Sequence, residues 1–135
     1  MPSSPFDFVI TGDVVFADSL LTDGFVAIAG DRIAAVGEGP APDAKQVKRY
    51  QDCLIFPGIV DGQIHAGSVE GVLGLRDATR AAAAGGVTTV VDMPFDDPNP
   101  VDTVARLESK IAALEDIAVV DVALYATAPK GAAHY

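Results

Sequence analysis

The sequence has little of what several large classes of protein require. It contains one cysteine in 135 residues, so no disulfide can form within the chain. No apolar run approaches the roughly 18 residues that a membrane-spanning helix needs. Residues 1–5 include no basic region followed by an apolar stretch, so no secretory signal is visible. These absences predict a cytoplasmic protein with no membrane partner.

Positive charge is also scarce. Nine Lys and Arg residues stand against nineteen Asp and Glu residues, which gives a net charge of −10. Nucleic-acid binding needs Lys and Arg gathered into a patch, whereas here they are scattered along the chain. The composition therefore predicts no nucleic-acid partner, and the acidity is expected mainly to favour solubility.

Half of the residues are hydrophobic, and the length suffices for one domain with a core of its own. The single cysteine, Cys53, begins the apolar run Cys53–Phe56. A free cysteine in such a run usually packs as a small apolar side chain. Cys53 is therefore predicted to be a buried strand residue.

The first 56 residues read as short strands separated by turns. Gly, Asp and Pro mark turns at 11–13, 22–24 and 30–31 and a surface loop at 38–43. Between them lie alternating or apolar segments, which predict strands at 6–10, 14–16, 25–29, 32–37 and 46–56. Closely spaced strands of this kind favour antiparallel pairing, so residues 1–56 are predicted to form a small β layer.

After Pro57 the pattern changes to alternating strands and helices. Buried strands are predicted at 58–60, 87–93 and 117–125, and helices at 69–84 and from Pro100 onward. Gly85 and Gly86 would end the first helix, and Asn99 would cap the second. The second helix carries an apolar stripe of Val104, Leu107, Ile111 and Leu114. This order predicts a parallel sheet with right-handed crossovers.

Three parallel strands do not close a barrel. A βα barrel has eight strands and usually about 250 residues, and an open sheet leaves unpaired edges. Residues 57–135 are therefore predicted to be part of a barrel that the remainder of the same or another chain completes.

The most informative stretch is residues 56–67. Asp61, Gln63 and His65 alternate in it, and alternate residues of a strand point to the same face. The stretch resembles the first barrel strand of the amidohydrolase superfamily, whose signature reads Pro-Gly-x-x-Asp-x-His-x-His. In this chain Gln63 stands in the position of the first of those two histidines.

A second stretch, residues 79–94, is similar to the first helix and second strand of the cyclic amidohydrolases. This group comprises allantoinases, hydantoinases and dihydroorotases, and the similarity is strongest to allantoinases. The resemblance implies an α/β fold in which a small β-sandwich segment, residues 1–56, precedes the first three βα units of a TIM-type (β/α)8 barrel, residues 57–135. It also implies a homo-oligomer.

The resemblance further implies a metal-dependent hydrolase acting on a small cyclic amide or ureide. Such enzymes use one or two divalent metal ions, often zinc, to polarise the carbonyl and to lower the pKa of a bound water. Their ligands are the His-x-His pair, a carboxylated lysine on the fourth strand and two further histidines, and an aspartate on the last strand serves as the base. Only the first-strand motif lies in this chain, and His65 matches its second histidine.

Each candidate has an alternative explanation. A lone histidine such as His65 is more often a packed or hydrogen-bonded residue than a metal ligand, although neutral imidazole is the commonest metal ligand. Gln63 is a poor metal ligand because its amide oxygen is hard and uncharged, so it could instead bond substrate or neighbours and leave a mononuclear or empty site. Asp61 could orient a metal ligand by a hydrogen bond or cap the local backbone. Asp92 would face the catalytic rim, where a structural hydrogen bond is expected more often than catalysis.

Three further residues and one segment complete the predictions. Asp96 and Asp97 could line the substrate mouth, although a solvated turn before a helix is the ordinary explanation. Residues 67–71 replace a family segment that carries the substrate-gripping arginine of dihydroorotases, which argues against dihydroorotate. His134 is expected to be an unimportant terminal residue.

Three hypotheses follow. The chain is part of a metal-dependent cyclic amidohydrolase, or of a catalytically inactive relative kept as a scaffold or oligomerisation partner. As a third hypothesis, the 135 residues form a complete small α/β binding module.

Overall fold

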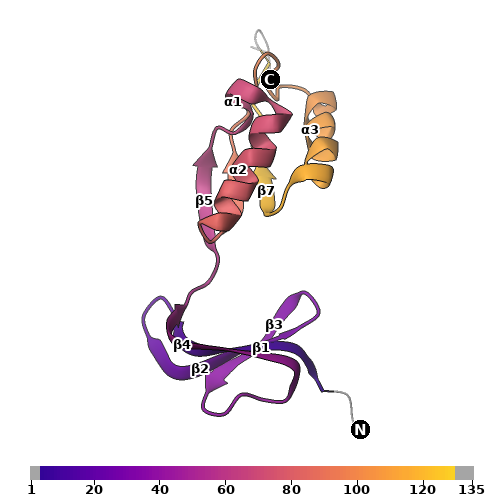
Figure 1. The fold of residues 1–135 in the computed structure, drawn as a ribbon. Helices are drawn as coiled ribbons and strands as arrows, with labels where there is room; N and C mark the ends of the chain where they lie inside the picture. Colours follow the sequence, from indigo (N-terminus) through magenta and orange to yellow (C-terminus); the bar gives the residue numbers. More distant parts are fainter. Residues whose placement is uncertain (1–3, 130–135) are drawn as a thin grey trace. The chain divides into compact units, whose positions relative to one another are not determined.

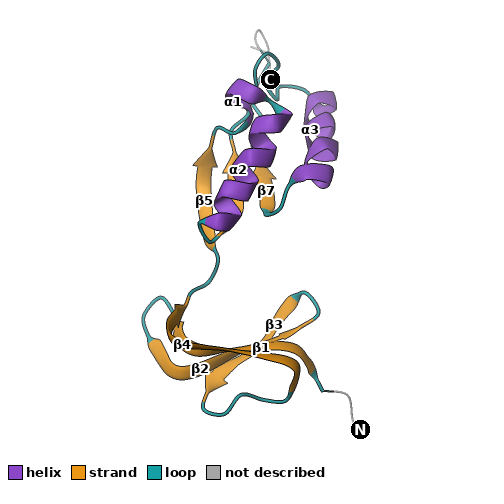
Figure 2. Ribbon diagram, viewed as in Figure 1, coloured by secondary structure: helices purple, strands orange, loops and turns teal. Residues whose placement is uncertain are grey.

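A computed structural model describes residues 4–129 of the chain. These residues form two compact units, one ending at Pro57 and the other beginning at Gly58 (Figure 1). The first is built only of strands, and the second combines strands with helices (Figure 2). The fold class is therefore α/β, with a strand-rich N-terminal sheet followed by βα units.

The N-terminal unit is a single four-stranded sheet. Its strands are β1 (Phe6–Val15), β2 (Leu20–Ala29), β3 (Arg32–Glu38) and β4 (Ala44–Ile55), in the order β3-β2-β1-β4. The pairs β1–β2 and β2–β3 are antiparallel, but β4 is parallel to β1. The expectation of purely antiparallel pairing is wrong here, because the chain crosses the sheet from β3 and joins β1 in the same direction.

Two predicted turns of this unit are irregularities within strands. The pairing register of β1 shifts between Gly12 and Val14, so residues 11–13 form a bulge and the strand continues. A Cβ atom on Gly12 would lie 2.8 Å from the Tyr50 carbonyl oxygen, which accounts for glycine there. Residues 22–24 likewise lie within β2, whereas the turn at Gly30 is confirmed, with φ at +62°.

The prediction for Cys53 is wrong. The residue lies in β4 and is exposed. The strand β4 is at an edge of the sheet, and its residues are mostly exposed in the described part of the chain. The apolar side chains of an edge strand can therefore stay exposed within the described part of the chain.

The second unit has the predicted alternation of strands and helices. Its strands are β5 (Ile59–Ile64), β6 (Val87–Asp92) and β7 (Asp121–Leu124), which form a parallel sheet in the order β5-β6-β7. Between β5 and β6 lie α1 (Gly67–Glu70) and α2 (Val72–Ala84), and α3 (Val104–Ile117) precedes β7. Helix α2 lies against β6 and α3 (Figure 2).

Both helices differ from the prediction at their starts. Gly71, at φ +55°, separates α1 from α2, so residues 69–84 are not one helix. The cap of α3 is Thr103, whose hydroxyl accepts from the Arg106 backbone N–H at 3.4 Å. Asn99 does not cap the helix, because the helix begins only at Val104. The Asn99 side-chain oxygen accepts from the Arg106 guanidinium.

The core of this unit is built around Leu75, Val90, Val101 and Leu114. The prediction that residues 58–60 are buried is wrong, since Ile59 and Val60 are 55% and 63% exposed. Strand β5 is an edge strand of the described sheet, so no neighbouring strand covers them. On β6, predicted to be buried on both faces, only Val90 and Asp92 are fully buried.

Candidate active site

The candidate site lies where β5 and β6 end side by side. Ile64 pairs with Asp92, and the Met93 backbone N–H donates to the Ile64 carbonyl at 2.9 Å. Because the strands are parallel, residues 65–68 and 93–97 leave the sheet at the same edge. In parallel α/β folds this carboxyl edge is where catalytic groups gather.

The structure brings Gln63 and His65 together, as the alternation of strand residues predicts. Their Nε2 atoms lie 3.5 Å apart, and both side chains are exposed. The Nδ1 atom of His65 lies 3.5 Å from the Ser68 hydroxyl. The His65 ring is stacked with Phe95, with ring centroids 6.0 Å apart and planes 11° apart. His65 thus has neighbours on several sides, and the residue remains exposed.

Asp61 makes a local backbone contact. Its Oδ1 atom accepts from the Gln63 backbone N–H at 3.1 Å, and the residue is exposed. Asp61 was predicted either to orient a metal ligand or to cap the local backbone, and this contact is of the second kind. The contact lies within β5, at the residue that carries the Gln63 side chain.

Asp92 is fully buried at the end of β6. One carboxylate oxygen accepts from the Ala66 backbone N–H at 2.9 Å, and the other pairs with the Lys110 ammonium at 2.6 Å. Asp92 therefore connects helix α3 to the residue that directly follows His65. These contacts are structural and leave no carboxylate oxygen facing the open edge.

Asp96 and Asp97 differ from each other. Asp96 pairs with Lys110 at 2.8 Å and its side chain is 18% exposed, so it is not the solvated turn residue that the sequence favoured. Asp97 is exposed, and its backbone N–H donates to the Gly67 carbonyl at 3.4 Å. His134 lies outside the described residues.

The sequence reasoning missed Lys110 and Phe95. Lys110 lies between Leu107 and Leu114 at helical spacing, so a charged residue stands on the face that packs inward. A lysine on the apolar face of a helix is rarely buried unless a carboxylate pairs with it, and Asp92 at a strand end is such a partner. The sequence could have predicted this ion pair from the position of Lys110 on the helix and of Asp92 at the end of the strand.

A divalent metal fits this edge only in part. His65 offers an imidazole, a common metal ligand, and Gln63 offers an uncharged amide. Within residues 4–129 no group of three or more His, Cys, Asp and Glu side chains is placed to hold a metal ion. Further ligands would have to come from outside the described residues. Lys110 is a helix residue and does not match the fourth-strand lysine that the resemblance implies.

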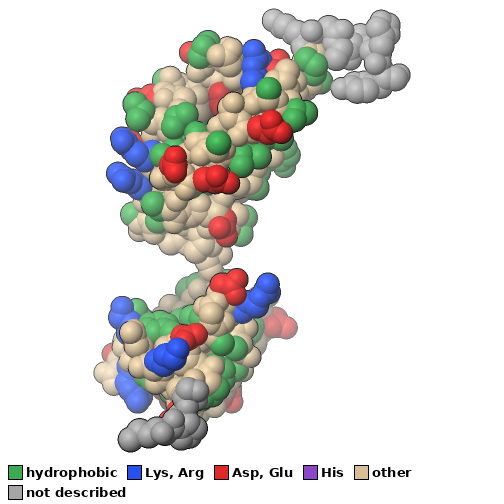
Figure 3. All heavy atoms as spheres, turned by 90° about the vertical axis from the view of Figure 1, so that its right-hand side faces the viewer, with side chains coloured by type: hydrophobic (Ala, Val, Ile, Leu, Met, Phe, Trp, Pro, Cys, Tyr) green, Lys and Arg blue, Asp and Glu red, His purple; other side chains and the backbone are tan. Residues whose placement is uncertain are grey.

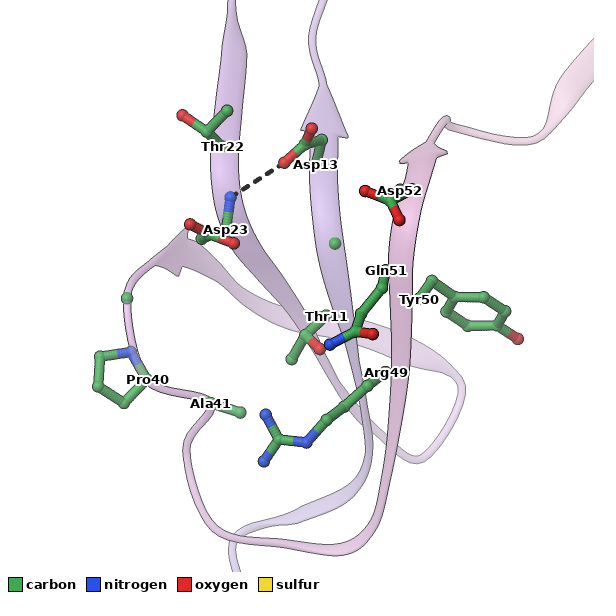
Figure 4. Close-up of a pocket in the computed structure, with 12 residues that line it drawn as sticks. Thr11, Asp13, Thr22, Asp23, Pro40, Ala41, Arg49, Tyr50, Gln51 and Asp52 are labelled. Carbon is green, nitrogen blue, oxygen red and sulfur yellow. Dashed lines mark hydrogen bonds between the residues drawn. The ribbon is translucent and has the colours of Figure 1, made fainter.

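A separate polar cavity of about 590 Å³ lies in the N-terminal unit. Thr11, Arg49 and Gln51 extend toward it and Tyr50 points away (Figure 4). The Asp23 backbone N–H donates to Asp13 at its rim. The cavity contains no His, so it offers no donor set like that of His65.

Charges of both signs are mixed on one face of the described residues. On the face that Figure 3 draws, basic side chains of the described residues stand among acidic and apolar ones without forming a continuous surface. Among these residues, no helix has the length and apolar character needed to cross a membrane.

Similarity to curated proteins is clear, although no family model matches the sequence. An allantoinase from Streptomyces avermitilis is 36% identical over 104 residues, which cover 74% of this chain and 23% of the relative. A dihydroorotase from Aeropyrum pernix is 35% identical over 131 residues, which cover 92% of this chain and 28% of the relative. An Escherichia coli allantoinase is 35% identical over 122 residues, which cover 87% of this chain and 26% of the relative. The chain thus spans about a quarter of the length of these relatives.

Solved structures of amidohydrolases also match this chain. A crystal structure of D-aminoacylase superimposes with a TM-score of 0.71 at 26% identity, over 90% of this chain and 30% of that one. An N-acyl-D-glutamate deacylase from Bordetella bronchiseptica, solved with zinc and a phosphonate inhibitor, shares the fold with a TM-score of 0.66 at 20% identity, over 90% and 29%. The chain belongs to the amidohydrolase superfamily, in its cyclic amidohydrolase group, and corresponds to the N-terminal portion of its relatives.

Proposed function

We propose that this chain is the N-terminal portion of a metal-dependent hydrolase that cleaves a C–N bond of a cyclic amide or ureide, as an allantoinase or hydantoinase does. The observation that carries the proposal is His65, exposed at the carboxyl edge of the β5-β6 sheet within the Pro57–Gly67 motif. The allantoinases and dihydroorotase that the chain resembles support the ring substrate.

In this proposal the described residues prepare one side of the site. A bound divalent metal supplies Lewis-acid activation of the ring carbonyl and of a water. The site holds one or two metal ions, zinc among the candidates. His65 is one ligand, and residues outside the described part supply the others. Gln63 sits beside His65 and bonds substrate or the neighbouring imidazole. Asp61 fixes the backbone before them, and Asp97 lies at the exposed mouth with Asp96 behind it.

The rest of the architecture follows from barrel closure. We propose that further βα units of the same or another chain cover both edges of the β5-β6-β7 sheet and complete a (β/α)8 barrel. Residues 1–56 and 57–135 are then the two domains of this portion, in a cytoplasmic homo-oligomer. Dihydroorotate is disfavoured as substrate, because residues 67–71 hold no arginine.

The test uses the full-length protein. Metal content is measured by elemental analysis, and hydrolysis is screened on allantoin, hydantoins and dihydroorotate. We expect bound divalent metal and turnover of a ureide or hydantoin ring, with both reduced in His65→Ala. The matched control is Glu108→Ala, at an exposed position of α3 in the same unit, which should keep both. Absence of both metal and turnover in the full-length protein would refute the proposed function.

A second candidate function is a catalytically inactive relative that serves as a scaffold or oligomerisation partner. The observation that favours it is Gln63, which stands where the motif has its first histidine. Retention of metal by the full-length protein, with loss of hydrolysis in Gln63→Ala, would exclude this alternative. Normal assembly without metal or turnover would support it.

A further inference from the structure

We propose that Lys110 is a positioning residue for the candidate site, holding from α3 the two carboxylates that fix the segment around His65. The Lys110 ammonium pairs with Asp92 and Asp96, so its effect on His65 would pass through these two carboxylates. The catalytic part of this inference rests on the proposed function, whereas its structural part does not.

The first support is the burial of the three charges. The side chain of Lys110 is 4% exposed, that of Asp92 is fully buried and that of Asp96 is 18% exposed. In the described part of the chain, Lys110 is the one cation paired with either carboxylate. Since a buried charge without a partner is costly, the positions of the three groups depend on one another.

One route from Lys110 to His65 runs through the backbone. The ammonium pairs with Oδ2 of Asp92, and Oδ1 of the same carboxylate accepts from the Ala66 N–H. With both oxygens engaged, the carboxylate has a fixed orientation. Ala66 directly follows His65, so the hydrogen bond at its nitrogen restrains the backbone from which the imidazole projects.

The second route runs through Phe95. Lys110 pairs with Asp96, and the preceding residue, Phe95, stacks on the His65 ring. A Cβ atom at Gly67 would overlap the Asp96 carboxylate, so Asp96 packs directly on the segment that follows His65. Loss of the Lys110 ammonium would therefore loosen both the backbone and the ring contact of His65.

The test compares three variants of the full-length protein. Lys110→Met removes the ammonium but keeps much of the length of the side chain. Asp96→Asn is milder, because it leaves the Lys110–Asp92 pair intact. Glu108→Met is the matched control on the exposed face of α3. Hydrogen exchange is followed by mass spectrometry in peptides covering residues 63–68, 92–97 and 72–84, together with hydrolysis of the ring substrate.

We expect Lys110→Met to speed exchange in 63–68 and 92–97 but not in 72–84, and to lower hydrolysis about ten- to hundredfold, as loss of an outer support of a metal ligand does. Asp96→Asn should give a smaller change of the same kind, and it decides the matter if Lys110→Met does not fold. Unchanged exchange in 63–68, or equal changes in all three peptides, would overturn the proposal. If the parent protein binds no metal and hydrolyses no ring, the proposed function fails while the exchange measurement still tests Lys110.

Discussion

At the scale of single residues, the buried ion cluster of Lys110, Asp92 and Asp96 is the most sensitive point. Removing one partner of a buried ion pair typically costs about 3–5 kcal/mol, because it leaves an uncompensated charge. We expect Lys110→Met to lower the free energy of unfolding of the full-length protein by about that amount, measured by urea denaturation. Glu108→Met should change it by about 0.5 kcal/mol or less, and similar losses in both variants would contradict the argument.

Gly67 is a second sensitive residue. A methyl group there would overlap the Asp96 carboxylate, so Gly67→Ala must displace Asp96 or residues 66–68. Overpacking of this kind typically costs about 1–3 kcal/mol, and we expect a loss of that size in thermal or urea unfolding. Gly62→Ala is the matched control, because a methyl there meets nothing within 4 Å in the described part of the chain. Equal losses for the two variants would refute the contact.

The sequence predicted part of the site at this scale. Strand alternation correctly predicted that Gln63 and His65 lie together, because the period of two is a local property of the backbone. The partners Lys110 and Phe95 depend on how distant segments pack, which periodicity does not encode. Cys53 was mispredicted for a related reason, since an apolar run does not show which of its residues a neighbouring element covers.

At the scale of elements, Asp7 joins three strands of the N-terminal sheet. Its carboxylate on β1 accepts from the Gly30 N–H after β2 and pairs with Lys45 on β4 at 2.6 Å. The Gly30 hydrogen bond, and then Lys45, lower the pKa of Asp7 below its usual 3.8. A lowered carboxylate pKa stabilises the folded state above the unfolded pKa, and this contribution is lost as the pH falls through the folded value.

We therefore expect Asp7→Asn to lower the melting temperature of the full-length protein at pH 7. The difference from the parent should persist down to about pH 3.8 and shrink below it, because the protonated aspartic acid and asparagine are then alike. Calorimetry across this pH range checks the prediction. Asp31→Asn, whose side chain is 91% exposed, is the control. A difference that grows in acid would contradict the assigned sign.

Element order was more predictable than element boundaries. The alternation β5, α2, β6, α3, β7 follows from apolar patterns and Gly or Pro breaks that span many residues. The start of α3 depends on which side chain reaches the first free N–H groups, and Thr103 rather than Asn99 does so. The bulge at Gly12 resembled a turn because both use glycine, and only the pairing of β1 with β2 and β4 distinguishes them.

At the scale of the whole molecule, the described sheet of the second unit has more apolar surface than its own helices cover. Ile59 and Val60 on β5, and Tyr125 directly after β7, are all more than half exposed, and β5 and β7 are the edge strands. Exposed apolar side chains on unpaired edge strands favour association with other polypeptide. This is the surface that further barrel strands would cover under the proposed function.

The 135-residue chain by itself should therefore behave differently from the full-length protein. We expect the isolated chain to self-associate, to bind a hydrophobic dye and to melt without a sharp transition, because both strand edges and their apolar side chains stay in water. It should hydrolyse no ring substrate, since its described residues offer one good metal ligand. Sedimentation, dye fluorescence and thermal scans on both proteins provide the measurement. A soluble monomer with a cooperative melt would instead support the hypothesis of a complete α/β binding module, and would remove the need for further strands to cover β5 and β7.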